Sequence, residues 1–466
     1  MTTPDALTAP AARLGAVVQY ALLAGPLLSM LDSSIVNVAV SPIAAELHAP
    51  IATVQWTVSG YLLALGIGLA ATSYLARRFG VLPVYLFSIV AFTLASLLCA
   101  LAPSAEFLIA ARVLQGLAGA PMVPLAMSML LGSGGGSRSM SPVAGIMLFL
   151  GPALGPSLGG VLIGVWGWRA IFLVNLPIGV AAAISARRIP RMLAVVRQPA
   201  ARFDVVGWAL LAAGLALLLF GAGNSETGGW TTPETWIPLT GGFALLGGYA
   251  AWAWRSSHPI VDLRIVTRLP AVLSLVLCAF ASVVTYAAIF LLPVFMQTAQ
   301  GYTALAAGAA LLPQGVLTGL SLAFGPKLLE RLSVRFTVAL GFALLTAASV
   351  ALLAIDLTTP LWVTSLVLAC RAASIGFVIS PLLAVMLQGI EDARLADANT
   401  LFSIWQRIAG SIGIAVIVSL FTRNSVAFGP VAGLHDAAGA LIALSTIALV
   451  GASFLPRSRF RAIGRA

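Results

Sequence analysis

Charged residues are scarce in this chain. Only 8% of its 466 residues are Asp, Glu, Lys or Arg, whereas 60% are hydrophobic. A soluble domain carries about 25% charged residues, so this composition cannot cover a water-facing surface. The scarcity of charge therefore excludes an ordinary soluble fold and predicts a protein that is surrounded by lipid.

Cysteine and histidine are also rare. The three cysteines lie singly inside apolar runs, away from any histidine, so we expect buried thiols there rather than disulfides or metal ligands. The three histidines are scattered near the ends of the runs, and no HExxH motif or Ser/His/Asp constellation accompanies them. The sequence therefore predicts neither an enzyme nor a protein with a bound cofactor.

Long apolar runs are the main feature that is present. A membrane-spanning helix needs about 20 mostly apolar residues. Fourteen runs qualify, near 16–40, 54–73, 82–101, 106–131, 142–164, 169–186, 204–222, 236–254, 271–297, 303–325, 336–355, 360–388, 399–421 and 434–455. They are far longer than barrel strands and lack an alternation of period two. The predicted fold class is an all-α membrane protein with fourteen spans.

Basic residues are distributed unevenly between the predicted loops. With a cytoplasmic N-terminus, the cytoplasmic segments hold 20 of the 25 basic residues, and the opposite loops hold only Arg169 and Arg423. This bias predicts that both termini are cytoplasmic, and it explains the net charge of +11 without a nucleic-acid partner. The polar N-terminus and the long first run indicate a retained helix rather than a signal peptide.

The longest basic linker, from Arg187 to Arg202, divides the chain into six spans and eight. We take it as the main structural division. The predicted organisation is an N-terminal tail (1–15), a first group of six spans (16–190), a linker with the seventh and eighth spans (191–270), a second group of six spans (271–456) and a basic tail (457–466).

Two ionisable residues lie deep inside the spans at similar depth. A charge at the bilayer centre costs roughly 2.5–3.5 kcal/mol on insertion scales, so it needs a reason. Asp32 is the only acid well inside a span, and the helical rise of about 1.5 Å per residue places Arg112 of the fourth span at the same level. A nearby cation favours the ionised carboxylate, whereas burial favours the protonated form. The two residues are therefore a candidate proton-coupling pair, and a static ion pair between helices is the alternative.

Several ordered motifs resemble those of one transporter family. They are Leu31-Asp32-Ser-Ser-Ile-Val-Asn37-Val-Ala-Val, Arg112-Val-Leu-Gln115-Gly116-Leu-Ala-Gly119-Ala, Trp168-Arg169-Ala-Ile-Phe-Leu-Val-Asn175-Leu-Pro177, Phe203-Asp204-Val-Val-Gly207, Pro259-Ile-Val-Asp262-Leu-Arg264 and Gln406-Arg407-Ile-Ala-Gly410-Ser-Ile-Gly413. Together they resemble the fourteen-helix drug:proton antiporters of the major facilitator superfamily over nearly the whole chain. The resemblance implies two six-helix bundles plus two inserted helices, and proton-coupled export of hydrophobic or amphiphilic compounds by alternating access.

A glycine- and proline-rich segment of the fifth span adds to this resemblance. It reads Gly151-Pro152-Ala-Leu-Gly155-Pro156-Ser-Leu-Gly159-Gly160 and is similar to the antiporter motif that the family associates with export. Glycines spaced by four residues share one helix face and permit close backbone approach, and the two prolines remove helix hydrogen bonds. Ordinary tight packing is the alternative interpretation.

The two halves of the chain resemble each other at one position, because Arg371 lies in the twelfth span much as Arg112 lies in the fourth. Parallel halves with a substrate site near mid-membrane are expected of such folds. The predicted substrate contacts are Asn37, Gln55, Trp56, Tyr61, Gln115, Met122, Tyr286, Phe290, Gln314, Arg371, Gln406 and Arg407. Aromatic and Met side chains suit hydrophobic molecules of varied shape, although packing explains any single one equally well. Three in-span arginines against one aspartate disfavour a dedicated dication exporter and leave neutral and anionic amphiphiles open.

One loop departs from the family pattern. The family's loop between the second and third spans reads close to GxLADRxGRK, but the sequence here runs from Ser73 to Leu82 with Arg77 in place of the Asp. That Asp helps to latch the inner gate in the family. We therefore expect a charge-inverted latch, in which the basic pair Arg77 and Arg78 meets the acids before the thirteenth span, Glu391, Asp392 and Asp397. The alternative is that both arginines are solvated.

The resemblance and the composition also predict the driving force, the partners and the location. The driving force would be the proton gradient, and the partners would be protons, a hydrophobic small molecule and the lipid bilayer of a bacterial inner membrane. We expect a monomer. A lipid or envelope-precursor translocase of the same fold, or a proton-coupled importer, are the alternatives that the sequence leaves open.

Overall fold

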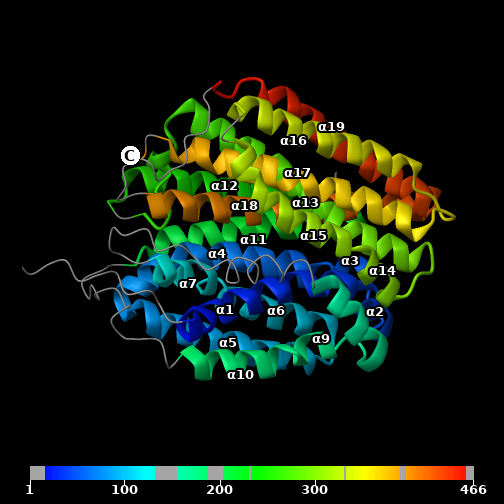
Figure 1. Ribbon diagram of the computed structural model, residues 1–466, viewed down its shortest axis with the longest axis horizontal. Helices are drawn as coiled ribbons and strands as arrows, with labels where there is room; N and C mark the ends of the chain where they lie inside the picture. The colour runs from blue at the N-terminus through cyan, green and yellow to red at the C-terminus, as the bar shows by residue number, and fades with distance from the viewer. Residues whose placement is uncertain are drawn as a thin grey trace, which may run out of the picture.

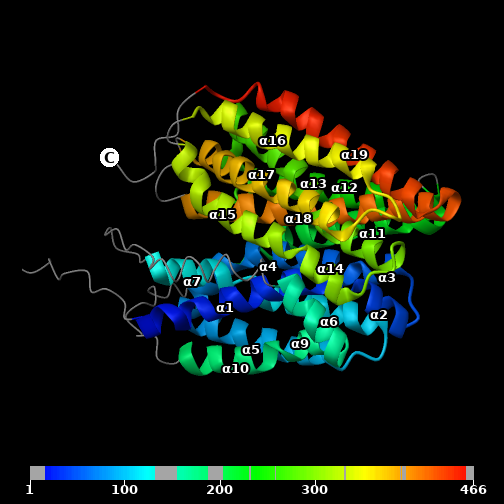
Figure 2. The ribbon, with the colours of Figure 1, turned by 45° about the vertical axis from the view of Figure 1, so that its right-hand side comes forward.

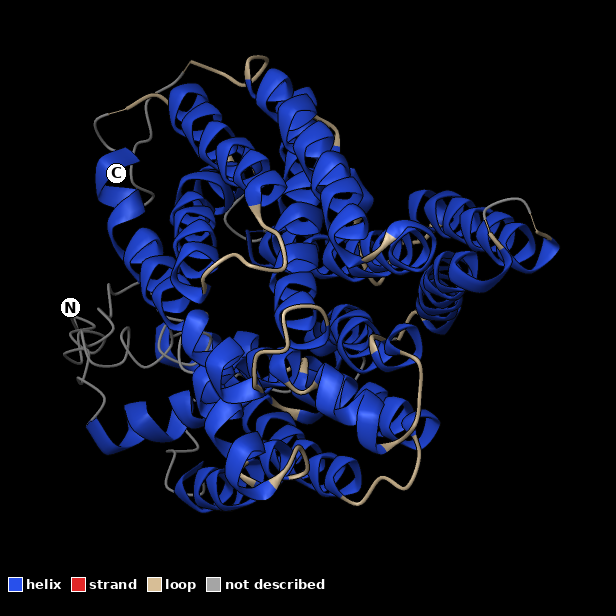
Figure 3. Ribbon diagram, turned by 90° about the vertical axis from the view of Figure 1, so that its right-hand side faces the viewer, coloured by secondary structure: helices blue, strands red, loops and turns tan. Residues whose placement is uncertain are grey.

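The structure is a computed structural model that describes residues 16–131, 155–186, 203–229, 232–257, 259–329, 332–388, 390 and 395–457. These residues form helices joined mostly by short turns, and no strand occurs among them (Figure 3). The prediction of an all-α membrane protein is confirmed.

In its described part, the first half of the chain contains three helices of 20 or more residues, α1, α4 and α5, and several shorter ones. Its elements are α1 (Ala16–Ile35), η1 (Val36–Val38), α2 (Val40–Glu46), α3 (Ile51–Val54), α4 (Trp56–Phe79), α5 (Val81–Ala100), α6 (Ala105–Gly119), α7 (Met122–Leu131), the helix Gly155–Trp166, α9 (Ala170–Leu173) and α10 (Asn175–Ala186).

Two helices connect this half to the second. They are α11 (Val205–Gly228) and α12 (Pro233–Arg255), and the short η3 (Leu263–Val266) follows them. The second half contains α13 (Leu269–Thr298), α14 (Ala304–Ala310), α15 (Leu312–Leu329), α16 (Val334–Ala351), η4 (Leu352–Ala354), α17 (Leu361–Leu387), α18 (Leu395–Phe428) and α19 (Pro430–Ala452).

Every predicted span coincides with at least part of a described helix. Eleven helical segments of the described chain are long and apolar enough to cross a membrane, and the described parts of the fifth and sixth spans, Gly155–Trp166 and Ala170–Ala186, are shorter. The number fourteen therefore stays a prediction, as do the domain boundaries.

Three spans that the sequence predicts as continuous are interrupted near a proline. The fourth divides into α6 and α7 around Pro121, the sixth into α9 and α10 just before Pro177, and the tenth into α14 and α15 just before Pro313. Proline has no N–H to donate and its ring clashes with the preceding turn. Each interruption changes which residues of the following segment face inward.

The helices gather into two halves that lie side by side. In Figure 1 the first half lies below and the α13–α19 half above, and Figure 2 shows the same division after rotation. The connecting pair lies on the seam, because α11 packs against α12 and also against α4 and α18. One helix from each half, α4 and α18, forms the centre of this seam.

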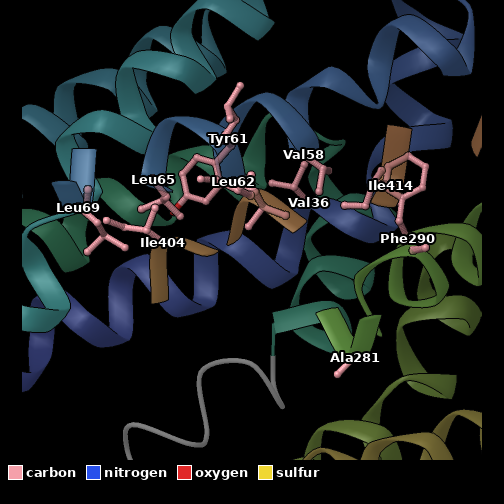
Figure 4. Packing of buried hydrophobic residues seen from close by; sticks show 14 of the residues in the cluster. Val36, Val58, Tyr61, Leu62, Leu65, Leu69, Ala281, Phe290, Ile404 and Ile414 are labelled. Carbon is pink, nitrogen blue, oxygen red and sulfur yellow. The ribbon is translucent and has the colours of Figure 1, made fainter. Parts of the chain in front are cut away.

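Branched apolar side chains fill the seam. Leu65 and Leu69 of α4 lie beside Ile404 of α18, and Val58 lies further along the same helix (Figure 4). All four are buried, and the Ser411 hydroxyl of α18 donates to the Ser59 carbonyl of α4 at 2.7 Å. Because lipid tails are as apolar as leucine, close packing and such hydrogen bonds hold the halves together rather than exclusion from water.

At one end of the seam the halves also meet directly. Gln297 Nε2 of α13 donates to the Val38 carbonyl of η1 at 3.1 Å, and Ser157 Oγ donates to the Gly308 carbonyl of α14 at 2.9 Å. The helix Gly155–Trp166 and α14 cross so closely that a Cβ added at Gly160 would lie 2.7 Å from the Ala304 carbonyl oxygen. We call this meeting of η1, α14 and the helix Gly155–Trp166 the closed end.

We expect Gly160→Val to open the closed end. The added side chain cannot fit against α14, and overpacking of this kind costs about 1–3 kcal/mol, so the population of the closed conformation falls by roughly 5- to 150-fold. The readout is the labelling rate of a cysteine placed at Asn37 by an impermeant maleimide added at the closed end. Gly164→Val is the matched control, since nothing lies within 4 Å of its Cβ. Equal labelling rates in both variants would contradict the assignment.

Candidate functional site

The carboxylate of Asp32 is completely buried and receives three hydrogen bonds. Arg112 Nη1 donates to Oδ2 at 2.5 Å, Gln115 Nε2 donates to Oδ1 at 3.1 Å, and Asn175 Nδ2 donates to Oδ1 at 2.7 Å. These donors come from α6 and α10, while the acid is on α1. Both oxygens are thus satisfied by protein groups, as a buried ionised carboxylate requires.

Arg112 is held just as firmly. Besides Asp32, it donates from Nε to the Thr57 carbonyl at 2.9 Å and from Nη1 to Gln115 Oε1 at 2.7 Å, and its side chain is fully buried. The guanidinium carbon lies 3.8 Å from the centre of the Tyr61 ring, a cation–π contact that a desolvated arginine strengthens. The structure therefore brings the two predicted proton-coupling residues together, and that role stays a prediction.

A second layer of polar groups supports the pair. Asn175 also donates to Ser96 Oγ at 3.0 Å, and Ser96 in turn donates to the Phe172 carbonyl at 2.9 Å. Both side chains are fully buried. Neither residue is among the predicted site residues. Asn175 does belong to the motif that ends at Pro177. The sequence does not predict the direction of its side chain, because the helix is interrupted between α9 and α10.

A central cavity of about 260 Å³ lies between the two halves. It is lined by Met30, Ser33, Ser34, Asn37, Val58, Leu62, Pro156, Ala281, Ser282, Thr285, Tyr286, Ile289, Leu311, Gln314, Gly315, Thr318, Ile375, Ile379, Gln406, Arg407 and Ile414. Five predicted substrate contacts are among them: Asn37, Tyr286, Gln314, Gln406 and Arg407. The cavity thus combines apolar walls with amides, hydroxyls and one guanidinium.

The other predicted contacts lie outside this lining, and their role in substrate binding stays a prediction. Gln115 and Tyr61 belong to the cluster around Asp32, Met122 and Phe290 are packed with no exposed surface, and Gln55 is buried where α4 begins. Trp56 faces the connecting pair, with its ring 6.4 Å from that of Phe220, and Arg371 reaches a separate side pocket. Hydropathy gives the depth of such residues but not the helix face on which they lie.

Asp32 does not itself line the cavity. Its neighbours on α1, Met30, Ser33 and Ser34, face the cavity, while Asp32 faces the interior of the first half. One helix therefore has the buried ion pair on one side and the cavity on the other. Any change in the ion pair that shifts α1 also changes the shape of the cavity.

The described part of the antiporter motif packs against both halves. A Cβ added at Gly159 would lie 2.8 Å from Ile35 Cγ1 of α1, whereas Gly160 faces Ala304 of α14, and Pro156 lines the cavity. Gly155 likewise adjoins Ser34. Gly151 and Pro152 lie outside the described residues. Close packing is thus shown for this segment, and its role in export stays a prediction.

The proposed latch lies mostly outside the described chain. Glu391 and Asp392 are not among the described residues, nor is the side chain of Asp397, so the pairing with Arg77 or Arg78 stays a prediction. The structure does place exposed Arg77 at a pocket of about 210 Å³ with Asp204 and Asp262 from the connecting region. Asp204 accepts hydrogen bonds from the Gly207 N–H and from Trp252 Nε1.

The described residues contain no candidate metal site. No group of three or more His, Cys, Asp or Glu side chains there could hold an ion. The polar chemistry of this part of the molecule therefore centres on the Asp32 cluster and on the central cavity.

Comparisons with known proteins place the chain in a family. The family model of the Major Facilitator Superfamily matches residues 22–414. A multidrug resistance protein B homolog of Mycobacterium tuberculosis is 34% identical over 84% of this chain and 73% of its own length. The multidrug export protein EmrB of Escherichia coli is 28% identical over 88% of this chain and 80% of its own. The chain belongs to the major facilitator superfamily.

Solved structures agree on the fold. The crystal structure of the POT family transporter PepTSo covers 94% of this chain and 97% of its own, with a TM-score of 0.68 and 16% sequence identity. A similarity at that identity shows the fold alone. The predicted major facilitator fold is confirmed.

We expect Arg112→Met to destabilise the protein by about 3–5 kcal/mol, because it leaves Asp32 charged, buried and without its cation. Adding Asp32→Leu should restore at least half of that loss, since the uncompensated charge is then gone. Thermal unfolding of the purified protein measures both.

Arg169→Met is the control for this experiment. Arg169 forms an ion pair with Glu46, but both side chains are more than one third exposed, so its loss should cost no more than about 1 kcal/mol. A double variant that unfolds at a lower temperature than Arg112→Met would contradict the charge argument.

Proposed function

We propose that the protein is a proton-coupled antiporter that exports hydrophobic or amphiphilic, drug-like compounds by alternating access. The names of its relatives, which refer to multidrug resistance and multidrug export, support export of such compounds. The central cavity between the halves supports a transport site rather than a catalytic one. No cofactor is needed, because the proton gradient supplies the driving force.

The single observation that carries the proton coupling is the placement of Asp32. It is a fully buried acid that shares α1 with the cavity lining. In general, burial favours the protonated form of a carboxylate and a nearby cation favours the charged form, so movement of the cation changes which form is favoured. Protonation weakens the attraction to Arg112 and therefore releases α1 from α6.

The proposed cycle uses this release. When the cavity opens outward, Asp32 takes up a proton from outside and the substrate leaves. When the cavity opens inward, Asp32 gives up the proton, pairs with Arg112 again and the site reloads. The reciprocal linkage between proton and substrate follows because each favours a different position of α1.

The orientation and location belong to the same proposal. The excess of positive charge near the chain termini favours a cytoplasmic position for both of them, in the bacterial inner membrane. With this orientation the closed end faces outward. We propose a monomer that exchanges protons and a hydrophobic small molecule within the bilayer.

We expect Asp32→Asn to abolish proton-driven efflux while leaving the protein folded. Asparagine keeps the size of the side chain but cannot gain or lose a proton, so uphill transport should fall at least about tenfold. The measurement is efflux of a dye panel from vesicles with and without a pH gradient. Glu106→Gln, which removes an exposed acid of α6, is the control and should transport normally.

The same assay separates the alternatives. Gradient-driven uptake instead of efflux would establish an importer, and loss of an envelope lipid on deletion without loss of resistance would establish a lipid translocase. Full uphill efflux by Asp32→Asn would overturn the coupling mechanism but not the membrane fold.

A further inference from the structure

Each half of the protein buries an arginine at a corresponding place, but only one has a carboxylate partner. Arg112 of α6 pairs with Asp32 of α1. Arg371 of α17 is only 5% exposed and has no ion pair among the described residues. The helix that begins the second half, α13, contains no Asp or Glu at all. The second half therefore has the arginine of this pair but no acid on the helix that corresponds to α1.

The hydrogen bonds of Arg371 do not neutralise its charge. Nη1 donates to Ser349 Oγ at 2.8 Å and Nη2 donates to the Val284 carbonyl at 2.7 Å. Both acceptors are neutral, and the bonds use two of the five N–H donors of a guanidinium. An arginine that is buried without an anion is unfavourable in a membrane and marks a functional position.

The surroundings of Arg371 connect it with the central cavity. Arg371 lines a side pocket of about 10 Å³ together with Thr285, Ile289, Gln314 and Ile375, and these four residues also line the central cavity. Gln314 Oε1 is buried there without a hydrogen-bond partner in the described part of the chain. One unpaired amide oxygen and one buried guanidinium thus lie at this wall of the cavity.

A second cation lines the central cavity itself. Arg407 of α18 lines the cavity and has no hydrogen-bond or ion-pair partner among the described residues. None of the residues that line the cavity or its side pocket is acidic, and Asp32 is occupied by Arg112. The cavity therefore concentrates positive charge between apolar walls such as Ile379 and Ile414.

We propose that the central cavity selects monoanionic amphiphiles, whose carboxylate or sulfonate head binds Arg371 and Arg407 while the apolar body lies along the isoleucine-lined wall. Guanidinium groups match such oxyanions geometrically and are more weakly hydrated than ammonium groups. The ligand supplies the anion that the second half lacks. This inference names the substrate class and rests on the proposed export function only for its assumption that the cavity is the transport site.

Two fluorescent probes with the same ring system test the proposal. Anilinonaphthalene sulfonate carries one negative charge, and phenylnaphthylamine is its neutral counterpart. Dissociation constants are measured with the purified full-length protein in nanodiscs, without a gradient, and corrected with empty nanodiscs. The unsubstituted protein should bind the sulfonate at least about tenfold more tightly than the neutral probe.

Three variants locate the selectivity. Arg371→Gln and Arg407→Gln should each weaken sulfonate binding by about tenfold or more and change binding of the neutral probe by less than about twofold. Arg423→Gln, an exposed arginine near the end of α18, is the control and should bind both probes normally. Unchanged sulfonate binding in both cavity variants would overturn the proposal, as would an equal loss for both probes in Arg407→Gln.

If Arg371→Gln does not fold, the Arg407→Gln variant decides alone, because Arg407 makes no hydrogen bond to the described part of the chain. Failure of the export function is distinguishable from failure of this inference. Anion-selective binding without gradient-driven efflux of either probe would remove the function only. Gradient-driven efflux with binding that is indifferent to both arginines would remove the inference only.

Discussion

A carboxylate without access to water persists only where other groups satisfy both of its oxygens. Around Asp32 this requirement brings together Arg112 and Gln115 from α6 and Asn175 from α10, with Ser96 of α5 behind them. Four helices of the first half are therefore positioned by one acid. Because partly satisfied polar networks are costly at low dielectric, the packing of these four helices depends on the hydrogen bonds that the Asp32 side chain makes.

The second half has a buried arginine but no acid on α13 to pair with it. Its buried Arg371 uses neutral acceptors and adjoins the cavity, whereas Arg112 is sealed within its bundle. We propose that the first half takes up and releases the proton and that the second half contacts the substrate. The two halves are in direct contact through α4 and α18.

The sequence predicted the fold class and the contact between Asp32 and Arg112, because hydropathy and helical rise determine depth in the membrane. It could not predict helix rotation. Tyr61 and Gln115 were therefore expected in the cavity but pack around Asp32, and Asn175 was missed because its helix restarts after a break near Pro177. The number of spans and the latch at Arg77 depend on residues that the structure does not describe.

In the proposed cycle Asp32 alternates between its charged and protonated forms. Infrared difference spectroscopy of the protein with isotope-labelled aspartate, recorded as the pH is raised from acid to alkaline, observes this directly. We expect an aspartic-acid carbonyl band that titrates in the unsubstituted protein and is missing from Asp32→Asn. A carboxylate at Asp32 that stays ionised over the whole range would contradict it.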